Sequence, residues 1–267
     1  VVIRAAAAPS RPPAVSLALG EAPPRTTWEH AESVHLDTVV WGDVAATPGV
    51  YRLQRTGPGR VWFDRQEAAD GDEVLLSATN HLLVAWPAAA AADAALHLAL
   101  TPLYSAADAV DQAFVEEADP RLASATLIEA ESYTEALRGQ LQVYSHRAFL
   151  SGGKGVSTPA VIGVGARWQI EVPADGRYLL ALKVSTHEPE AVRALRLDGR
   201  SLLADDRPIR IPTTGGFGAT PEEWRHVIVS TAPGQPVEFV LTAGRHTLDL
   251  ISVSGPLNLD ALRLIPR

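Results

Sequence analysis

The chain has 267 residues, of which 46% are hydrophobic and 20% are charged, and its formal net charge is −8. This composition is typical of a folded protein with one large or two ordinary domains. Nucleic-acid binding depends on neutralising phosphates, so the negative charge and the lack of a Lys/Arg cluster argue against a nucleic-acid partner. The absence of cysteine excludes disulfides and Cys-ligated zinc but not secretion. No stretch reaches the roughly 18 consecutive apolar residues that a membrane-spanning helix needs.

The sequence also contains no methionine, not even an initiator. We therefore expect a piece of a longer protein, whose signal peptide or membrane anchor lies outside these residues. Residues 1–27 are rich in Ala and Pro, which predicts a semi-extended linker or an edge segment. Two alternatives are a strand that starts at residues 15–19 and the continuation of an upstream element in residues 1–8.

Residues 28–103 consist of short apolar or alternating segments separated by turn-forming residues. Residues 50–54 alternate, with Tyr51 and Leu53 on one side, and Gly/Pro-rich turns precede and follow them. The five alanines at 88–92 favour a helix by propensity, but Pro87 and the alternation that follows favour a loop at least as strongly. Strands at this spacing predict an antiparallel β-sandwich.

Residues 104–125 differ from both flanks and are predicted to connect two domains, with room for a short helix. Asp119–Pro120 would end that helix, and the domain boundary is expected near Ser124. Apolar residues at helical spacing occur at Ala106, Ala109, Val110, Ala113 and Phe114.

Residues 126–267 alternate more regularly. No long amphipathic helix interrupts them, so a parallel βαβ sheet is not expected. The predicted fold class is all-β, with two β-sandwich domains of which the C-terminal one is a jelly roll. The inward-facing sets are Trp168/Ile170/Val172, Tyr178/Leu180/Leu182/Val184, Val237/Phe239/Leu241 and His246/Leu248/Leu250.

Three carboxylates near the two ends of this second domain point to a metal. On a strand, Glu129 and Glu131 would lie on the same face, about 7 Å apart. By the same alternation, Asp260 would lie on the core-facing side of its strand with Leu262 and Leu264. Like charges side by side, and a charge that faces inward, are unfavourable unless something neutralises them. We expect a calcium ion, a hard cation that takes oxygen ligands. The alternative is two solvated strand carboxylates and a salt-bridged Asp260.

From residue 126 onward the chain resembles carbohydrate-binding modules of families 6 and 35. The matching stretches occur in the family order over about 140 residues. They are IEAE (128–131), SGGKGVS (151–157), WQIEVPADGRYLLALKV (168–184), LRLDGRSL (195–202), IPTTGGFGATPEEW (211–224), AGRHTLDLI (243–251) and LNLDALRL (257–264).

This resemblance implies a β-jelly roll, a structural calcium near the chain ends and sugar binding by loops. Glu129, Glu131 and Asp260 match the family's calcium-binding positions, in agreement with the charge argument. Asn258 matches a position that often contacts the ligand, and Phe217 stands where the family often has a tryptophan. Phe is the poorer stacking platform because it has no hydrogen-bond donor.

Two further aromatic side chains are candidates for stacking on a sugar ring. Tyr144 lies in a polar loop with His146 and Arg147. Trp224 precedes an expected strand, where a tryptophan is more often packed against the core than exposed to ligand. The predicted carbohydrate-binding residues are therefore Tyr144, Phe217, Trp224 and Asn258.

The first domain resembles the protective-antigen-type sugar-binding module over PGVYRLQRTGPGRVWFDRQ (48–66) and VLLSATNHLLVAW (74–86). That family often carries an adjacent Asp-Asp pair that binds calcium and sugar. Residues 56–59, Thr-Gly-Pro-Gly, occupy that region of this chain, so the resemblance does not extend to calcium-dependent sugar binding here.

Catalysis is not expected. Glu129 and Glu131 meet the separation of a glycosidase pair, about 5–9 Å, but beside calcium they would be ligands. A catalytic role for Glu222, Glu223 or Asp206 is the enzyme alternative, and the adjacent pair Glu222–Glu223 is more simply explained as solvated.

The expected function is non-catalytic binding of a poly- or oligosaccharide, outside the cytoplasm, at the cell surface or in the periplasm. The chain would be an ancillary region, monomeric as this fragment, of a glycosidase, a polysaccharide lyase or a membrane glycosyltransferase, so the parent chain can be membrane-anchored. The alternative is a structural or assembly module that has kept the sandwich and lost sugar binding.

Overall fold

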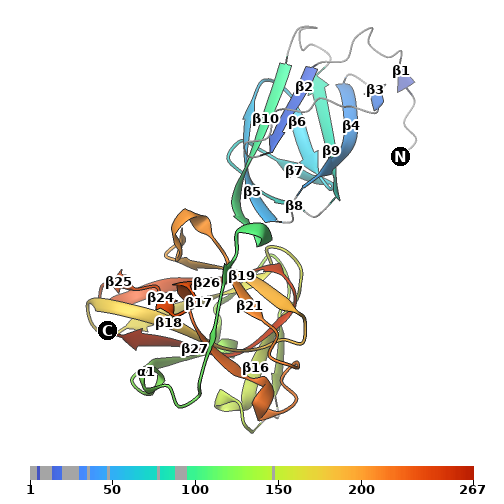
Figure 1. Cartoon of the computed structure of the whole chain (residues 1–267). Coiled ribbons are helices and arrows are strands. Elements are labelled where there is room, and N and C mark those ends of the chain that lie inside the picture. Colours follow the sequence, from blue (N-terminus) through green and yellow to red (C-terminus); the bar gives the residue numbers. More distant parts are fainter. Residues whose placement is uncertain are drawn as a thin grey trace. The chain divides into compact units, whose positions relative to one another are not determined.

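The computed structural model describes residues 5–6, 14–19, 30–34, 37–46, 49–76, 79–87, 95–145 and 148–267. Strands dominate these residues (Figure 1), and contacts divide the chain into two compact units, Val1–Leu103 and Tyr104–Arg267. The described part of the chain has no helix of the length and apolar character needed to cross a membrane.

The first unit is built from short strands joined by turns. They are β1 (Ala5–Ala6), β2 (Ala14–Leu19), β3 (His30–Val34), β4 (Asp37–Ala45), β5 (Gly49–Thr56), β6 (Arg60–Phe63), β7 (Gln66–Ala68), β8 (Glu73–Leu76), β9 (Thr79–Pro87) and β10 (Ala95–Ser105). One sheet has the order β1-β3-β4-β9-β6-β7 and the other β2-β10-β5-β8.

The two sheets of this unit share one core, so it is a β-sandwich, as its turn spacing predicts. Leu53 and Leu96 from one sheet and Val61 and Leu82 from the other are fully buried in a single cluster. Along β5 the alternation is confirmed from Tyr51 to Gln54, because Tyr51 and Leu53 are buried while Arg52 and Gln54 are exposed; Val50 is buried as well. Residues 14–19 form β2, an edge strand parallel to β10, as one of the alternatives for this segment predicts. Residues 88–92 lie outside the described residues.

The second unit contains more strands and several single turns of helix. The strands are β11 (Val110–Asp111), β12 (Phe114–Val115), β13 (Thr126–Glu129), β14 (Glu135–Leu137), β15 (Gln142–Ser145), β16 (Lys154–Thr158), β17 (Gly165–Val172), β18 (Gly176–Ser185), β19 (Glu190–Leu197), β20 (Arg200–Ser201), β21 (Ile209–Pro212), β22 (Arg225–Ile228), β23 (Ser230–Ala232), β24 (Gln235–Pro236), β25 (Phe239–Leu241), β26 (Gly244–Ser254) and β27 (Leu257–Pro266). The helical turns are η1 (Ala106–Asp108), α1 (Pro120–Ala123), η2 (Ala130–Ser132), η3 (Ser151–Gly153), η4 (Ala204–Asp206) and η5 (Pro221–Glu223).

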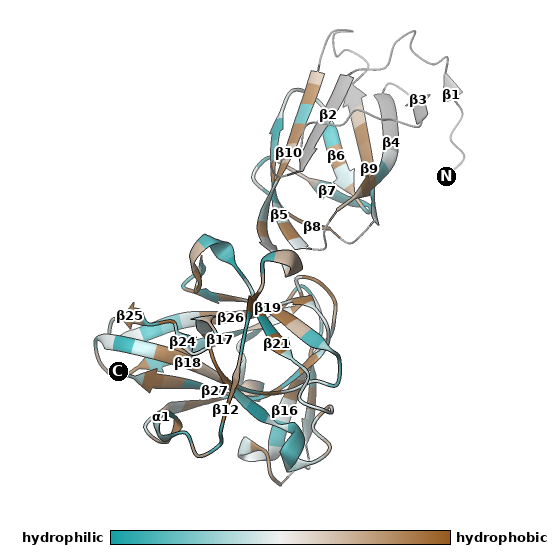
Figure 2. Ribbon diagram, in the orientation of Figure 1, coloured by the Kyte–Doolittle hydropathy of each residue, from teal (hydrophilic) through white to brown (hydrophobic). Residues whose placement is uncertain are grey.

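Two large sheets and the two-stranded sheet β23-β24 form this unit, and their hydrophobic residues concentrate in the strands (Figure 2). We call β11-β21-β19-β26-β17-β14 the first sheet and β12-β22-β18-β27-β16-β15 the second sheet. Trp168 and Leu250 of the first sheet and Leu182 and Leu262 of the second are fully buried in one shared core. The predicted inward sets around Trp168 and Leu180 are confirmed, whereas Val237, Phe239 and His246 are only half-buried.

Residues 104–125 belong to this second unit, and the helix predicted from the spacing in residues 106–117 is wrong. After the single turn η1, β11 pairs with β21 of the first sheet and β12 pairs with β22 of the second. The backbone groups of two sheet edges are available to pair here, and that pairing overrides a weak helical periodicity. Within the described residues the α-helix of this segment is the four-residue α1.

Candidate functional site

Glu129 and Glu131 do not share a strand face. β13 ends at Glu129, and the turn η2 follows at once, so the alternation that predicted their separation stops there. The turn nevertheless brings both carboxylates to Gly152 in η3. A Cβ on Gly152 would lie 3.1 Å from Glu131 Oε1 and 3.7 Å from Glu129 Oε1. The two carboxylates therefore converge on a glycine whose φ of +57° also favours the absence of a side chain.

Asp260 does not share the face of Leu262, because a β-bulge interrupts β27. Lys183 pairs with Ala261 and Val184 pairs with Leu259, which leaves Asp260 as the extra residue. Leu259 and Leu262 consequently both enter the core, while Asp260 is turned away from it. Its side chain is fully buried all the same.

Two donors meet the Asp260 carboxylate. The backbone N–H of Ser151 donates to Oδ1 at 2.9 Å, and Lys183 Nζ lies 3.1 Å from Oδ2. Burial raises the pKa of Asp260 above its ordinary value, and the nearby Glu129 raises it further, while Lys183 and Ser151 lower it. Neither Lys183 nor Ser151 was predicted as a site residue, although both stand in family-like stretches of the sequence.

The donor set fits a hard cation at Glu129 and Glu131. One oxygen of Glu129, Oε1, accepts a hydrogen bond from Ser151 Oγ at 2.7 Å. The other oxygen, Oε2, and Glu131 Oε2 are buried and have no hydrogen-bond partner among the described residues. Buried carboxylate oxygens need a neutralising partner, and calcium supplies one.

The third predicted ligand fits less directly. In the described residues, no three His, Cys, Asp or Glu side chains lie close enough together to hold a metal by themselves. Asp260 already faces Lys183, so a cation at Glu129 and Glu131 would take its remaining ligands from backbone carbonyls or water.

Phe217 stands on a loop that polar contacts hold in place. Its ring is 42% exposed, and its carbonyl accepts a hydrogen bond of 2.7 Å from Asn258 Nδ2. Glu223 Oε2 accepts the N–H of Ala219 at 2.6 Å, and Thr214 Oγ1 accepts the N–H of Thr186 at 2.9 Å. The loop therefore presents an aromatic ring from a fixed backbone, which reduces the entropy lost on binding.

His187 extends this aromatic surface. Its ring centroid lies 5.9 Å from that of Phe217, with the planes tilted by 53°. The residue is exposed and follows β18, so it belongs to the same end of the sandwich. Sequence analysis missed His187 because no spacing rule connects it to a loop 30 residues further along the chain.

The rings of the other two predicted sugar-binding residues are each packed against a glycine. The Trp224 side chain is buried, its Nε1–H donates to Gly218 O at 3.3 Å, and a Cβ on Gly218 would lie 2.5 Å from the ring. Tyr144 lies in β15 opposite Gly155 of β16, and its ring occupies the space that a Cβ on Gly155 would need. The Trp224 ring therefore presents no open face beside Phe217.

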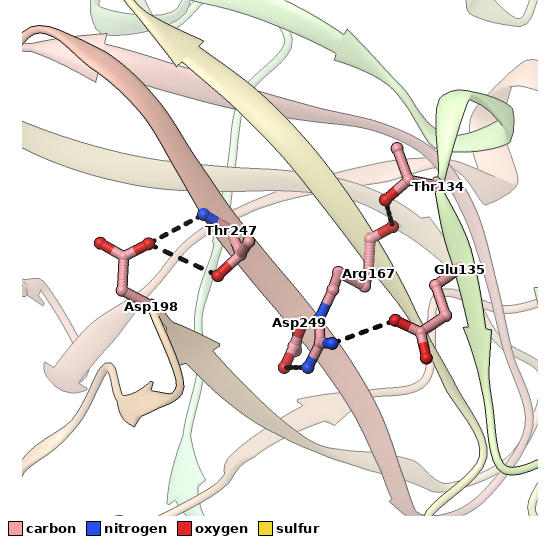
Figure 3. A network of polar contacts seen from close by, with 6 residues as sticks. All are labelled: Thr134, Glu135, Arg167, Asp198, Thr247 and Asp249. Carbon is pink, nitrogen blue, oxygen red and sulfur yellow. Dashed lines mark hydrogen bonds and ion pairs between the residues drawn. The ribbon is translucent and has the colours of Figure 1, made fainter.

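The outer face of the first sheet carries a ladder of ion pairs (Figure 3). Arg167 of β17 donates through Nε and Nη2 to both carboxylate oxygens of Asp249, at 2.7 and 2.9 Å. Its Nη1 donates to Glu135 Oε2 at 3.0 Å, and Asp249 raises the pKa of the guanidinium above its ordinary value. Nearby, Asp198 Oδ1 accepts the N–H of Thr247 at 2.9 Å. These charges satisfy one another and stabilise the sheet.

The carboxylates of the enzyme alternative do not form a pair. Glu223 is engaged with the Phe217 loop, and Glu222 is exposed, with a pKa that a hydrogen bond from Thr220 lowers. Asp206 is exposed in the turn η4. A general acid needs a raised pKa, and a lowered one favours the ionised form.

No protein-family model matches the chain, and no curated protein matches it. Among solved structures, the chain is similar to the C-terminal family 6 carbohydrate-binding module of LamC, a marine laminarinase from Zobellia galactanivorans. The match covers 53% of this chain and 98% of the LamC module, with 22% identity and a TM-score of 0.40. A native family 35 module from Clostridium thermocellum is similar over 54% of this chain and 99% of its own, with 16% identity and a TM-score of 0.43. A module of lichenase 5A from Cellvibrio mixtus, in complex with cellotriose, matches over 53% and 97%, with 20% identity and a TM-score of 0.40.

Proposed function

We propose that the second unit binds a poly- or oligosaccharide without chemically altering it. The observation that carries this proposal is Phe217, an exposed aromatic ring on a loop fixed by Asn258 and Glu223 and extended by His187. Aromatic faces bind sugar rings, and a pre-organised loop binds with a smaller entropic cost. The family-like stretches of the sequence add independent support.

In the parent protein this unit would act as a tether outside the cytoplasm. Binding to a glycan would raise the effective concentration of a linked domain near its substrate. A glycosidase, a polysaccharide lyase or a membrane-anchored glycosyltransferase would each gain from such a tether, and the fragment itself would be monomeric.

The test of sugar binding is a glycan-array screen of the whole chain and of its Phe217→Ala variant. We expect binding to a narrow glycan class, weakened about tenfold by Phe217→Ala, because one stacked ring contributes about 1 kcal/mol or more. Val240→Ala is the matched control, since Val240 is an apolar side chain, 74% exposed, outside the Phe217 loop. Equal binding by both variants would refute a role for Phe217.

We further propose that a structural calcium binds at Glu129 and Glu131, with Asp260 held nearby by Lys183. Calcium at 100 times its dissociation constant would stabilise the fold by about 2.7 kcal/mol, because it binds only the folded chain. Chelation should therefore lower the melting temperature of the natural chain. Chelation should leave the melting temperature of the Glu131→Gln variant almost unchanged. The Glu171→Gln variant, which alters an exposed glutamate of β17, should lose as much melting temperature on chelation as the natural chain does.

The second candidate function is a structural or assembly module without sugar binding. One observation favours it: one of the two N–H donors of Asn258 Nδ2 is used on the Phe217 carbonyl, and the Phe217 side chain has no donor of its own. If the chain binds no glycan on a broad array while its melting temperature still rises with calcium, the structural module is favoured over the tether.

A further inference from the structure

A second concave site lies on the outer side of the second sheet, away from the shared core. Its volume is about 510 Å³, within the range of small-molecule pockets. Three parts of the chain form its walls: residues 115–117 from the end of β12 onward, Phe149 before η3, and Pro221, Glu222 and Trp224 in and after η5. Lys183 of β18 and His226 of β22 also line it.

Lys183 and His226 are cross-strand partners. They are directly paired in the register of β18 and β22, which places their side chains next to each other on one face. Leu182 and Val184 enter the core on either side of Lys183, so that face is the outer one. Both side chains are largely covered, with 15% of Lys183 and 1% of His226 exposed.

His226 presents an unused acceptor. Its Nε2 lies 2.8 Å from Glu117 Oε2, but the two groups are not aligned for a hydrogen bond. Burial is the largest effect on its pKa and lowers it, which favours the neutral ring. Both ring nitrogens are buried and have no hydrogen-bond partner among the described residues, and a neutral imidazole offers one of them as an acceptor.

Lys183 supplies the complementary donor. Its ammonium has three N–H groups, and the Asp260 carboxylate 3.1 Å away can take only part of them. Because the two residues are cross-strand neighbours, a ligand hydroxyl can donate to the unprotonated nitrogen of His226 and accept from Lys183 Nζ. Among common ligand groups, an alcohol satisfies both neighbours at once, whereas a carboxylate offers no proton to the imidazole.

The walls favour several hydroxyls and no negative charge. Glu116 and Glu222 provide carboxylate acceptors, and hydrogen bonding lowers the pKa of Glu222 and keeps it ionised. Phe149 and Trp224 provide apolar contact. Acceptors for O–H groups beside an aromatic surface suit a sugar ring, while the carboxylates disfavour a uronate.

We propose that this pocket is a second saccharide site, which takes one unit of a neutral sugar independently of the Phe217 loop. The inference extends the proposed function, because it gives the same unit two separate glycan contacts. Two contacts on one tether strengthen attachment through effective concentration.

The experiment is an NMR titration of the isotope-labelled whole chain with the methyl glycosides of glucose, galactose, mannose and N-acetylglucosamine, and with methyl glucuronide. We expect saturable shifts of the amides of residues 115–117, 183 and 225–226 with a neutral glycoside. Glu222→Gln should weaken that binding about tenfold through loss of a charge-assisted hydrogen bond. Phe217→Ala should leave these shifts unchanged, and Glu171→Gln is the control for loss of a surface charge.

Each outcome separates this proposal from the proposed function. Saturable shifts at residues 213–218 and 258 alone would overturn the pocket and keep the Phe217 site. Shifts at the pocket alone, weakened by Glu222→Gln, would support the pocket and remove the Phe217 site. Shifts at the pocket with methyl glucuronide only would overturn the proposal that its ligand is neutral. If no glycoside gives a saturable shift at the pocket, the proposal of a second saccharide site is overturned altogether.

Discussion

Single buried charges in the second unit each rely on particular partners. Arg193 is fully buried, and it donates to the carbonyls of Val192 and Ser254 and to Thr158 Oγ1 at 2.8–2.9 Å. Burial lowers its pKa to about 9, which still leaves it charged at neutral pH. Asp260 depends in the same way on Ser151 and Lys183. Substitutions at such residues leave a polar partner buried and unsatisfied, which costs more than the lost bond itself.

His246 gives the chain a pH-dependent stability. Asp198 Oδ2 lies 2.7 Å from its Nδ1 and Thr242 O lies 2.9 Å from its Nε2, so both nitrogens face acceptors and the folded state favours the charged ring. The hydrogen bond to Asp198 is the largest cause that raises the pKa of His246. Its stabilisation is therefore fully present below the unfolded pKa of about 6.5 and is lost as pH rises through the higher folded value.

The prediction is that His246→Gln destabilises the chain more at about pH 6 than at about pH 9. Urea midpoints measured across that range for the natural chain and the variant check it. His187→Gln, at an exposed histidine, is the control. A difference between the natural chain and His246→Gln that stays constant with pH would contradict a charged His246.

At the level of elements, residues 104–125 connect the edges of both sheets in the second unit. β11 pairs with the first sheet and β12 with the second, and Gln112 lies between them. Its Nε2 donates to Ser230 O at 3.0 Å, and its Oε1 accepts the Ser230 N–H at 2.9 Å. This two-way amide contact fixes the crossing of the segment from one sheet to the other.

Gln112→Ala should lower the free energy of unfolding by about 2 kcal/mol, because it removes the side-chain partner of two buried backbone groups of Ser230. Urea unfolding measures the loss. Gln169→Ala, at an exposed glutamine of β17, should change stability little. Equal stability of the two variants would mean that water replaces the Gln112 amide.

At the scale of the whole molecule, the second unit begins before the boundary that the sequence indicates. Leu122 of α1 covers Leu179, Ala181, Ile228 and Ile265 on the outer side of the second sheet. A fragment cut near Ser124 would expose this apolar cluster and remove β11 and β12. Residues 104–267 are therefore the smaller unit that keeps its own surface covered.

We predict that residues 126–267 alone melt about 10 °C below residues 104–267, from a loss of about 3 kcal/mol of buried apolar surface and edge pairing. Calorimetry of the two fragments checks this. Leu122→Ala within residues 104–267 should reproduce part of the loss. Identical melting temperatures would show that the segment adds no stability.

The sequence by itself determined the all-β class and the alternating strands, because side-chain alternation acts between near neighbours. Charge repulsion marked Glu129 and Glu131 as a pair that needs a partner, although a turn and not a shared strand face brings them together. Phe217 and Asn258 were predicted together and lie together. The partners from distant segments depended on the tertiary structure, since no local rule encodes them: Lys183 for Asp260, Glu117 for His226, and His187 for Phe217.

The tertiary structure also decided which face of β27 carries Asp260 and whether residues 106–117 form a helix or strands. A single bulge shifts the alternation of a strand, so residues on one side of it point to the opposite face from the one that a regular strand predicts. The periodicity of the sequence cannot reveal a bulge. Residues 106–117 have a helical spacing, but a short isolated helix is marginal in water, whereas pairing with the two sheet edges packs Val110 and Phe114 against the core.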